Sequence, residues 1–305
     1  MKKLVLIDGH SILNRAFYGV PELTNSEGLH TNGIYGFLNI MFKVLDEEQA
    51  DYLAVAFDVS APTFRHEMYP EYKGTRKPMP GELQEQVPMM KEVLSSMEIP
   101  ILTKAGFEAD DIIGTVAKSA AEAGVEVSVI SGDRDLLQLA DASILIRIPK
   151  TAKGQTTMYD YRPEDVKREY GVTPLEFIDV KALMGDSSDN VPGVPSIGEK
   201  TATALIQKYH SIEKAYENVE EVKPPRASKA LKEHIEEARF SRALVTIDTK
   251  VPLAFDLEEM KLGRLFTPKS LEWIRRMEFK SLYKRFENMD VEAITASFDY
   301  QSTES

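Results

Sequence analysis

The sequence predicts an α/β fold with a mainly parallel central sheet, flanked by helices and followed by a helical subdomain. Short apolar runs alternate with amphipathic helical patterns as far as Ile148, and strand patterns nearly vanish after Pro163. Strands that alternate with helices are typical of a parallel sheet with helices on its faces. We therefore place a boundary near residue 160, with an α/β domain over residues 1–160 and a helical subdomain over residues 161–287.

The composition narrows the class of protein. The chain of 305 residues is 43% hydrophobic and 9% aromatic, which is enough for a sizeable core. It has no run of about 18 apolar residues, and Asp8 interrupts the apolar N-terminus too early for a signal peptide. We therefore expect a cytoplasmic protein with no membrane partner.

Residue types that are rare or absent restrict the chemistry. Zero cysteines exclude disulfides, thiolate metal sites and a cysteine nucleophile. With only five histidines, a metal site should be rich in oxygen ligands, which favours magnesium or manganese over zinc. The net charge of −12 does not exclude a nucleic acid partner, because phosphate binding depends on local basic patches.

The elements of the first domain follow from the spacing of apolar residues. We expect strands over residues 2–7, 52–57, 99–102 and 125–130, and helices over residues 33–45, 83–97 and 108–123. Thr31 or Asn32 is a suitable N-cap for the first of these helices. Three of the strands lead directly into acidic residues, namely Asp8, Asp58 and Asp133. Ligands of open parallel sheets collect at the carboxyl ends of strands, so these acids are candidates for one site.

A further group of carboxylates crowds the start of the helix expected over residues 108–123. Glu108 and Asp111 are three positions apart and would share a helix face, while Asp110 would lie near the positive end of the helix dipole. Like charges at this spacing destabilise one another unless cations lie between them. An ordinary acidic first turn of an exposed helix is the alternative. Together with the strand-end acids, Glu108 and Asp111 can converge on one edge of the sheet.

The connection over residues 61–81 differs from its surroundings. It contains four prolines and a set of basic and aromatic side chains that includes Arg65, Tyr72, Lys73, Arg76 and Lys77. Long connections in compact domains are usually functional or disordered. Its basic residues could contact phosphates and Tyr72 could stack on a base, and a solvated surface loop is the alternative.

The helical region contains a glycine-flanked segment over residues 183–202. A short apolar hairpin is followed by a helix that begins near Glu199, so backbone N–H groups would point outward. This helix-hairpin-helix pattern binds phosphate without reading sequence, although a plain helix connection is also possible. Asp186 and Asp189 could face the acidic edge of the sheet. Further along, Phe279, Leu282, Tyr283 and Phe286 are expected to pack, and residues 288–305 look like a polar tail or linker.

Many acids, few histidines and phosphate-binding elements together indicate hydrolysis of a phosphodiester with two metal ions. Such ions lower the pKa of the attacking water and stabilise the leaving oxygen, so that no nucleophilic side chain is needed. Lysine or arginine from the basic connection could neutralise charge on the phosphate. The five histidines show no serine and acid pattern that would support nucleophilic catalysis.

Five motifs carry a resemblance to a known family. The segments are Val5 to His10, Phe57-Asp58 with Thr63 to Arg65, Phe107 to Asp111, Gly132 to Asp135, and Leu183 to Ala202. In this order they resemble the 5′ nuclease domain of bacterial DNA polymerase I, within the flap endonuclease superfamily. The resemblance extends to about Phe286 and implies a PIN/resolvase-like sheet and a helical subdomain with a helix-hairpin-helix-type motif at about residues 183–209.

The resemblance implies a role for each matching residue. The metal-binding acids would be Asp8, Asp58, Glu108, Asp110, Asp111, Asp133, Asp135, Asp186 and Asp189. Lys73 and Arg76 would contact the scissile phosphate from an arch over about residues 61–97. The DNA-contacting residues would be Arg15, Arg65, Tyr72, Gly193, Val194, Ile197, Gly198, Lys200 and Thr201. Ser196 stands where the family commonly has glycine.

The resemblance also implies cofactors and partners. Two Mg²⁺ are expected, with Mn²⁺ able to substitute, and K⁺ can bind backbone carbonyls of the hairpin. The expected activity is 5′-3′ exonuclease and 5′ flap endonuclease action of a monomer, on branched or nicked duplex DNA and on RNA primer junctions. The chain would be either free-standing or fused to, or acting with, a DNA polymerase.

Two other classes of function stay open from the sequence. One is a protein that binds branched DNA but whose nuclease centre has decayed, which the complete set of acids disfavours. The other is a single-domain ribonuclease with a related acidic α/β site, which the duplex-binding hairpin disfavours.

Overall fold

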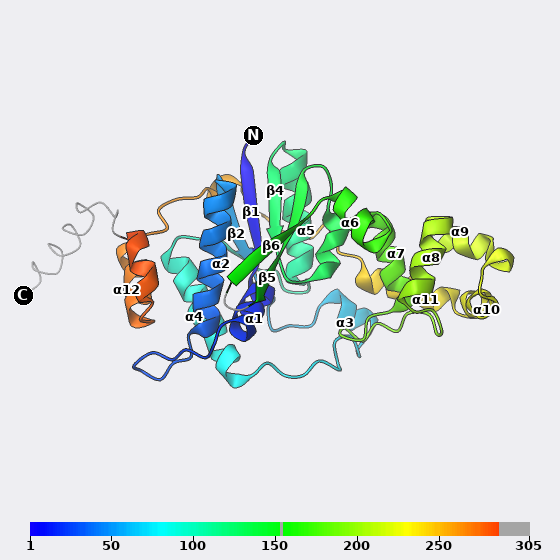
Figure 1. Ribbon diagram of the computed structural model, residues 1–305, viewed down its shortest axis with the longest axis horizontal. Helices are drawn as coiled ribbons and strands as arrows, with labels where there is room; N and C mark the ends of the chain where they lie inside the picture. Colours follow the sequence, from blue (N-terminus) through cyan, green and yellow to red (C-terminus); the bar gives the residue numbers. More distant parts are fainter. Residues whose placement is uncertain (153–154, 287–305) are drawn as a thin grey trace, which may run out of the picture.

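A six-stranded sheet forms the centre of the α/β domain (Figure 1). The computed structural model describes residues 1–152 and 155–286. The strands are β1 (Lys3–Asp8), β2 (Tyr52–Ala56), β3 (Ile101–Leu102), β4 (Glu126–Ile130), β5 (Ile144–Ala152) and β6 (Gln155–Tyr161). Their order is β3-β2-β1-β4-β5-β6, and all neighbours are parallel except β5 and β6, which are antiparallel. The parallel sheet is therefore confirmed, while the β5–β6 hairpin was not predicted.

Side chains of successive strand residues enter two different cores. In β1, Val5 and Ile7 pack in one apolar cluster, and Leu4 and Leu6 pack in the other, as the two-residue period of a strand requires. The elements on the two faces are α1 (Gly9–Gly19), α2 (Asn32–Glu48) and α4 (Gly81–Ser96) on the first, and α5 (Ala109–Glu122) with the 3₁₀ helix η1 (Arg134–Leu139) on the second. A short helix, α3 (Phe64–Met68), lies in the connection before α4.

The order of the strands creates a natural binding position. β1 lies between β2 and β4, so the chain first builds the sheet on one side of β1 and then crosses to the other side. Crevices at such switch points, outside the carboxyl ends of the strands, are where open parallel sheets bind ligands. Asp8 ends β1, and the loops after β2 and β4 carry the other predicted strand-end acids.

A bundle of helices forms the other end of the molecule (Figure 1). Its elements are α6 (Pro163–Tyr170), α7 (Pro174–Met184), α8 (Glu199–Tyr209), α9 (Ile212–Glu217), η2 (Val219–Glu221), α10 (Pro225–Glu233) and α11 (Ile235–Val245). Helix α7 contacts α8, α11 and η1, so the bundle shares a continuous apolar cluster with one face of the sheet. The helical subdomain is therefore joined to the α/β domain through a common core.

The last described segment returns to the α/β domain. It contains η3 (Glu258–Met260), α12 (Pro268–Arg276) and η4 (Lys280–Phe286). Phe279, Leu282 and Phe286 are buried in the cluster that α2 and α4 also build, at the end opposite the helical bundle (Figure 1). The ring of Phe266 stacks on Phe42 of α2 at a centroid distance of 5.7 Å. Residues 262–286 are thus not part of the helical subdomain to which we assigned them, although their predicted packing is confirmed.

Other expectations meet the structure with smaller differences. The basic connection over residues 61–81 contains α3 and a series of turns, and α4 accommodates Pro88 in its interior. The tail over residues 288–305 lies outside the described residues. No helix within residues 1–152 and 155–286 has the length and apolar character needed to cross a membrane.

The returning segment gives a test of the fold. Phe279 is 4% exposed, so Phe279→Ala should lower the free energy of unfolding by about 3–5 kcal/mol through lost burial and an unfilled cavity. The neighbouring Lys280 is exposed, and Lys280→Ala should stay within about 0.5 kcal/mol of wild type. Chemical denaturation measures both. Equal stability of the two variants would show that the segment does not belong to this core.

Candidate active site

Asp8 occupies the switch point of the sheet. As the residue before α1, it accepts a hydrogen bond from the Ser11 N–H at 3.1 Å, and its second oxygen accepts one from the Ser131 hydroxyl at 2.7 Å. Burial raises the pKa of Asp8 to about 6, and the nearby charges of Asp58 and Asp133 add to the rise. The Asp8 carboxylate is therefore fixed in position, and too little positive charge lies near it to balance its own.

Asp58, after β2, is held in its ionised form. It accepts a hydrogen bond from the Ala109 N–H at 2.8 Å, and Nδ1 of His10 lies 3.4 Å from its other oxygen. Burial acts to raise the pKa of Asp58, but the hydrogen bonds from His10 and Ala109 outweigh it and hold the pKa at about 2. The bond to Ala109 ties this acid to the first turn of α5.

The acids at the start of α5 point in different directions. Glu108 is the N-cap of the helix, and its N–H donates to Asp111 at 3.0 Å in a capping box. Asp110 lines the cavity at the sheet edge, together with Asp8, Asp58 and Asp133. Burial raises the pKa of Asp110 well above its ordinary range, and repulsion from Asp133 and Asp8 raises it further.

Asp111 faces the protein interior instead of the cavity. It is fully buried, and its oxygens accept hydrogen bonds from both terminal nitrogens of Arg65, at 2.7 and 2.8 Å. Arg65, which we expected to contact DNA, is only 2% exposed and also donates to the backbone carbonyls of Leu244 and Thr246. The structure therefore places neither Asp111 at a metal-binding position nor Arg65 at a DNA-accessible one, because each neutralises the other in the core.

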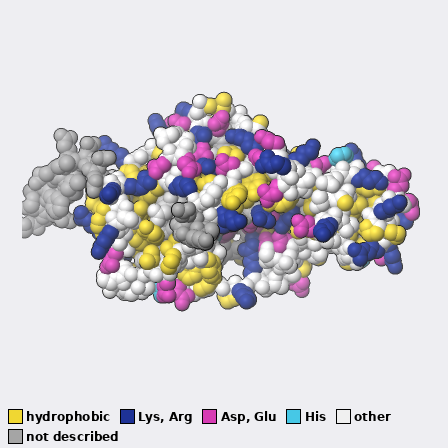
Figure 2. All heavy atoms as spheres, viewed as in Figure 1, with side chains coloured by type: hydrophobic (Ala, Val, Ile, Leu, Met, Phe, Trp, Pro, Cys, Tyr) yellow, Lys and Arg dark blue, Asp and Glu magenta, His cyan; other side chains and the backbone are white. Residues whose placement is uncertain are grey.

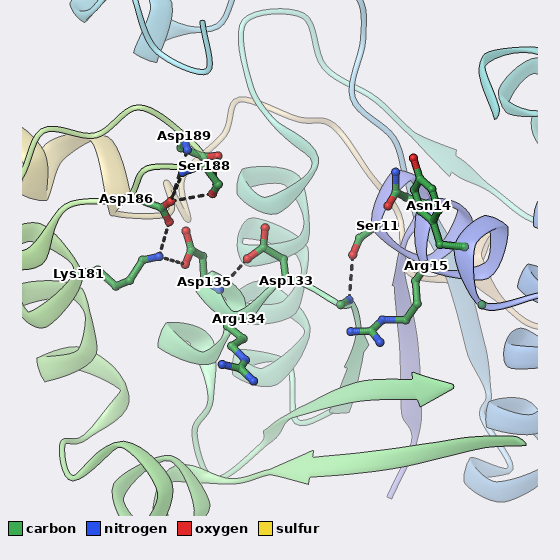
Figure 3. A pocket seen from close by; sticks show the side chains of 13 residues that line it. Ser11, Asn14, Arg15, Asp133, Arg134, Asp135, Lys181, Asp186, Ser188 and Asp189 are labelled. Carbon is green, nitrogen blue, oxygen red and sulfur yellow. Dashed lines mark hydrogen bonds and ion pairs between the residues drawn. The ribbon is translucent and has the colours of Figure 1, made fainter. Parts of the chain in front are cut away.

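Two more acids follow β4, as Figure 3 shows. Asp133 is the residue before η1 and accepts a hydrogen bond from the Asp135 N–H at 2.9 Å. Asp135 forms an ion pair with Lys181 of α7 at 3.0 Å. Burial raises the pKa of Asp135 to about 6, and Asp133 raises it further against the opposing effect of Lys181.

The helical subdomain contributes the last two acids. Asp186 accepts hydrogen bonds from Lys181 at 2.5 Å and from the Ser188 hydroxyl at 2.7 Å (Figure 3). Burial acts to raise the pKa of Asp186, but these bonds hold it at about 2. Asp189 forms ion pairs with Arg76 and, at 3.9 Å, with Lys73. The expectation that Asp186 and Asp189 face the sheet's acidic edge is met by their position in the same cavities as Asp133.

The basic connection lies over these acids. Lys73 Nζ is 2.5 Å from Glu108, and its backbone N–H donates to the Asp189 carbonyl at 2.9 Å. Tyr72 is only 4% exposed, and its hydroxyl donates to Glu108 and Asp189, each at 3.2 Å. Tyr72 therefore holds the connection against the acids and is not free to stack on a base in this conformation. Arg76 is exposed and paired with Asp189.

Two adjoining cavities contain the site. One, of about 740 Å³, is lined by Asp8, Asp58, Glu108, Asp110 and Asp133; the other, of about 620 Å³, extends from Asp133 to Asp189. Basic and acidic side chains are interleaved over the middle of the face that Figure 2 shows. Across the described residues, no three acidic or histidine side chains are already arranged to chelate one ion. Instead, two lysine side chains of the protein form ion pairs with these acids: Lys73 with Glu108, and Lys181 with Asp135 and Asp186.

The donor set nevertheless fits hard divalent cations. All eight cavity acids supply oxygen ligands, which magnesium and manganese prefer. Asp8, Asp110 and Asp135 have raised pKa values because they are buried beside other carboxylates, so the cavity lacks positive charge. Bound cations would supply it.

The predicted hairpin lies between α7 and α8. Gly185 and Gly193 have φ values of +74° and +64°, and a Cβ on Gly193 would lie 2.4 Å from the Gly185 backbone nitrogen, so both positions require glycine. Val194 and Ile197 are 3% exposed, which leaves only their backbone for contact with a ligand. Ser196 has a φ of +68°, the left-handed conformation that glycine adopts readily.

The remaining predicted DNA contacts are distributed around this hairpin and the second cavity. Gly198 is the residue before α8, and Lys200 and Thr201 belong to the first turn of that helix, with Lys200 exposed. Arg15 of α1 lines the second cavity beside Gly132 (Figure 3). The pKa of Arg15 is lowered by partial burial and by the charge of Arg134.

Sequence reasoning missed several residues that organise the site. Lys181 joins Asp135 to Asp186, His10 contacts Asp58, and Ser11 and Ser131 bind Asp8. The motif around Asp8 contains His10 and Ser11, which offered a signal. No local pattern singled out Lys181, because its two partners lie in different domains.

Comparison with known proteins identifies the family. The family model for "5'-3' exonuclease, N-terminal resolvase-like domain" matches residues 3–171, more than half of the chain. This chain belongs to the 5′-3′ exonuclease family. The model for "5'-3' exonuclease, C-terminal SAM fold" matches residues 172–267. As a member of the family, the chain is a nuclease, a hydrolase of phosphodiester bonds.

Curated relatives of this 5′-3′ exonuclease chain are longer proteins. DNA polymerase I of Bacillus caldotenax is 43% identical over 287 residues, which are 94% of this chain and 32% of that protein. DNA polymerase I of Bacillus subtilis (strain 168) is 43% identical over 292 residues, 96% of this chain and 33% of that protein. The chain therefore spans about a third of the length of these relatives.

Solved structures share the fold of this exonuclease family member. The bacteriophage T5 5′-exonuclease with bound zinc has a TM-score of 0.67 at 24% identity, covering 81% of this chain and 90% of that chain. The catalytic core of Rad2 in complex with DNA substrate has a TM-score of 0.57 at 16% identity, covering 90% of this chain and 88% of that chain. At these identities the likeness shows the fold alone.

Neighbouring acids on α5 should respond to substitution in opposite ways. In EDTA, Asp110→Asn should raise the melting temperature, since it removes a charge that Asp133 and Asp8 repel. Asp111→Asn should cost about 3–5 kcal/mol, because it leaves the buried Arg65 guanidinium without its counter-charge. Thermal unfolding of the two variants tests the assignment. A stabilising Asp111→Asn with a destabilising Asp110→Asn would reverse it.

The stability of the metal-free protein should fall as the pH rises from about 4 to about 6. Asp8 and Asp135 have pKa values of about 6 when folded against 3.8 when free, so the folded state binds more protons in this window. Mg²⁺ should therefore raise the melting temperature more above pH 6 than below pH 4. Thermal scans with and without Mg²⁺ measure both effects. A metal-free protein that gains stability across this window would contradict the assignment.

Proposed function

We propose that this chain is a structure-specific 5′ nuclease, with 5′-3′ exonuclease and 5′ flap endonuclease activity on DNA and on RNA primers at nicks. The observation that carries the proposal is the convergence of eight acids from both domains on adjoining cavities at the switch point of the sheet. The glycine-flanked hairpin beside Asp186 and Asp189 supports the duplex part of the substrate, since such turns bind phosphate backbones.

The proposed metal ligands are the acids that line the cavities. They are Asp8, Asp58, Glu108, Asp110, Asp133, Asp135, Asp186 and Asp189. Two bound Mg²⁺, or Mn²⁺ in their place, would lower the pKa of the attacking water and stabilise the leaving oxygen. Because magnesium keeps several of its own waters, some of these acids act through water. Asp111 is not in this set, since Arg65 occupies both of its oxygens.

Cationic side chains of this chain would neutralise the scissile phosphate. Lys73 and Arg76 lie on the connection above the acids and are paired with Glu108 and Asp189. If metal ions balanced the charge of these carboxylates, Lys73 and Arg76 would be free to contact the phosphate, where charge accumulates in the transition state. Lys181, which is paired with Asp135 and Asp186, would become available in the same way.

The substrate and partners follow from the same arrangement. Lys200 and the backbone from Gly193 to Gly198 would hold duplex DNA, with K⁺ bound at the hairpin carbonyls. Arg15 would contact the strand that leaves the second cavity. The curated relatives are DNA polymerases I, so we infer that this nuclease is fused to such a polymerase or acts with one.

The two other candidate functions make different demands on the site. A decayed DNA-binding protein would have lost acids or their supports, whereas all eight acids are present here and hydrogen bonds fix Asp8, Asp58, Asp133 and Asp186 among them. A single-domain ribonuclease would lack the hairpin that α7 and α8 hold. Preference for single-stranded RNA over a 5′ flap would favour the ribonuclease.

Cleavage of a 5′-labelled double-flap duplex tests the proposal. With Mg²⁺ we expect release of a short 5′ fragment from near the flap junction, and with EDTA no release. Asp110→Asn should lower the rate by at least about 100-fold, since one metal ligand is lost, while binding of the flap in Ca²⁺ is retained. Asp248→Asn is the matched control, because among the described residues the Asp248 side chain accepts only the Lys250 N–H, outside the two cavities. Equal rates for both variants and wild type would contradict the proposal.

A further inference from the structure

One cation in the first cavity has no assigned role. Lys91 of α4 lines the cavity with Asp58, Asp110 and Glu108, and so do Lys73 and Arg76. Lys73 and Arg76 are paired with carboxylates, whereas Lys91 makes no ion pair with any residue in the described ranges. An ammonium group that is half-buried beside several acids, yet bonded to none of them, keeps its hydrogen-bond donors available for another anion.

The surroundings of Lys91 explain why it does not move to the acids. Its Nζ lies 4.9 Å from the ring centroid of Phe57, a cation–π contact. The Phe57 ring is fully buried. It packs against the Gly9 backbone, where a Cβ would be 2.5 Å away, and edge-on to His10. The ammonium is therefore held at a defined place in the cavity wall.

The helix that carries Lys91 is equally well fixed. Gln86, five residues earlier in α4, is fully buried, and its Oε1 accepts hydrogen bonds from the N–H groups of Gly33 and Ile34 at 2.8 and 3.1 Å. Its Nε2 donates to the Asn32 side chain at 3.1 Å. Gln86 thus replaces an N-cap for α2 and locks α4 against it. Lys91 differs in this respect from Lys73 and Arg76, which lie on the irregular connection.

The wall of this cavity is also chemically mixed. Val59, Met79 and Val87 line the same cavity, so its wall offers apolar surface in addition to the ammonium and the carboxylates. A phosphate, a sugar and a base present this combination of charge and apolar area. A nucleotide in this cavity would contact both kinds of surface.

The position of α4 fixes which nucleotide is bound. The hairpin that would hold duplex DNA joins α7 to α8, whereas α4 packs on α2 and lies on the other side of α1 from α7 (Figure 1). A strand that leaves the duplex and crosses the acids next reaches α4. For a 5′ flap, the part of the strand beyond the cleaved bond is its 5′ side.

We propose that Lys91 binds the phosphate next to the scissile one on its 5′ side, with the attached sugar or base against Val59, Met79 and Val87. This inference rests on the proposed 5′ flap cleavage. It makes Lys91 a fixed contact for the leaving strand, in addition to the mobile cations of the basic connection.

A methylphosphonate scan of the flap strand tests the contact. Replacing one phosphate at a time by an uncharged methylphosphonate should lower kcat/KM of the wild type by about tenfold at the first position 5′ of the cleaved bond. Lys91→Met keeps the alkyl stem against Phe57. Its kcat/KM on the unmodified strand should be about tenfold below that of the wild type, and a methylphosphonate at the first position 5′ of the cleaved bond should lower it no further. Lys91→Arg should retain the wild-type pattern. Lys269→Met removes an exposed charge from α12 and controls for general electrostatics.

The outcomes separate this inference from the proposed function. If the wild type does not cleave the unmodified flap with Mg²⁺, the proposed function fails. If it cleaves, but Lys91→Met and wild type lose rate equally at every modified position, only the Lys91 contact is overturned. The contact would also be overturned if Lys91→Met and the wild type differed in their response only at phosphates 3′ of the cleaved bond. Should Lys91→Met fail to fold, a wild-type scan with no sensitive phosphate on the 5′ side still refutes the contact.

Discussion

The buried guanidinium of Arg65 connects the parts of this molecule that must act together. It extends from α3, at the base of the basic connection, and binds both oxygens of Asp111 on α5. It also binds Glu108 at 3.2 Å and the carbonyls at the end of α11. A charge of this kind is tolerable in a core only when its donors are all satisfied, so the three elements are held in one arrangement. Lys73, Glu108 and the helical subdomain take their relative positions from it.

Around this link, the cavity acids are arranged at a cost to stability. Asp8, Asp110 and Asp135 are buried close to other carboxylates, and only part of their charge is balanced by Lys73 and Lys181. Stored repulsion of this type is common where function requires it, and rigid surroundings are needed to maintain it. The hydrogen bonds from Ser11, Ser131 and the α5 backbone supply that rigidity.

Much of the fold and the general place of the site could be predicted from the sequence. Asp8, Asp58 and Asp133 follow apolar runs, and parallel strands bring such residues to one edge. The direction of Asp110 and Asp111 could not be predicted, because Arg65 is distant in sequence and captures Asp111. The same limit applies to Lys181 and to residues 262–286. Their partners are chosen by tertiary contacts, which local periodicity does not encode.

The acids of the cavities come from both domains, since Asp186 and Asp189 belong to the helical subdomain and the others to the α/β domain. A cation bound by acids of both domains would link the domains as well as take part in the chemistry. Small displacements of the helical bundle would then change the spacing of the ligands by a similar amount. Under the proposed function, the position of a duplex bound at the hairpin would be coupled in this way to the spacing of the ligands around the reacting bond.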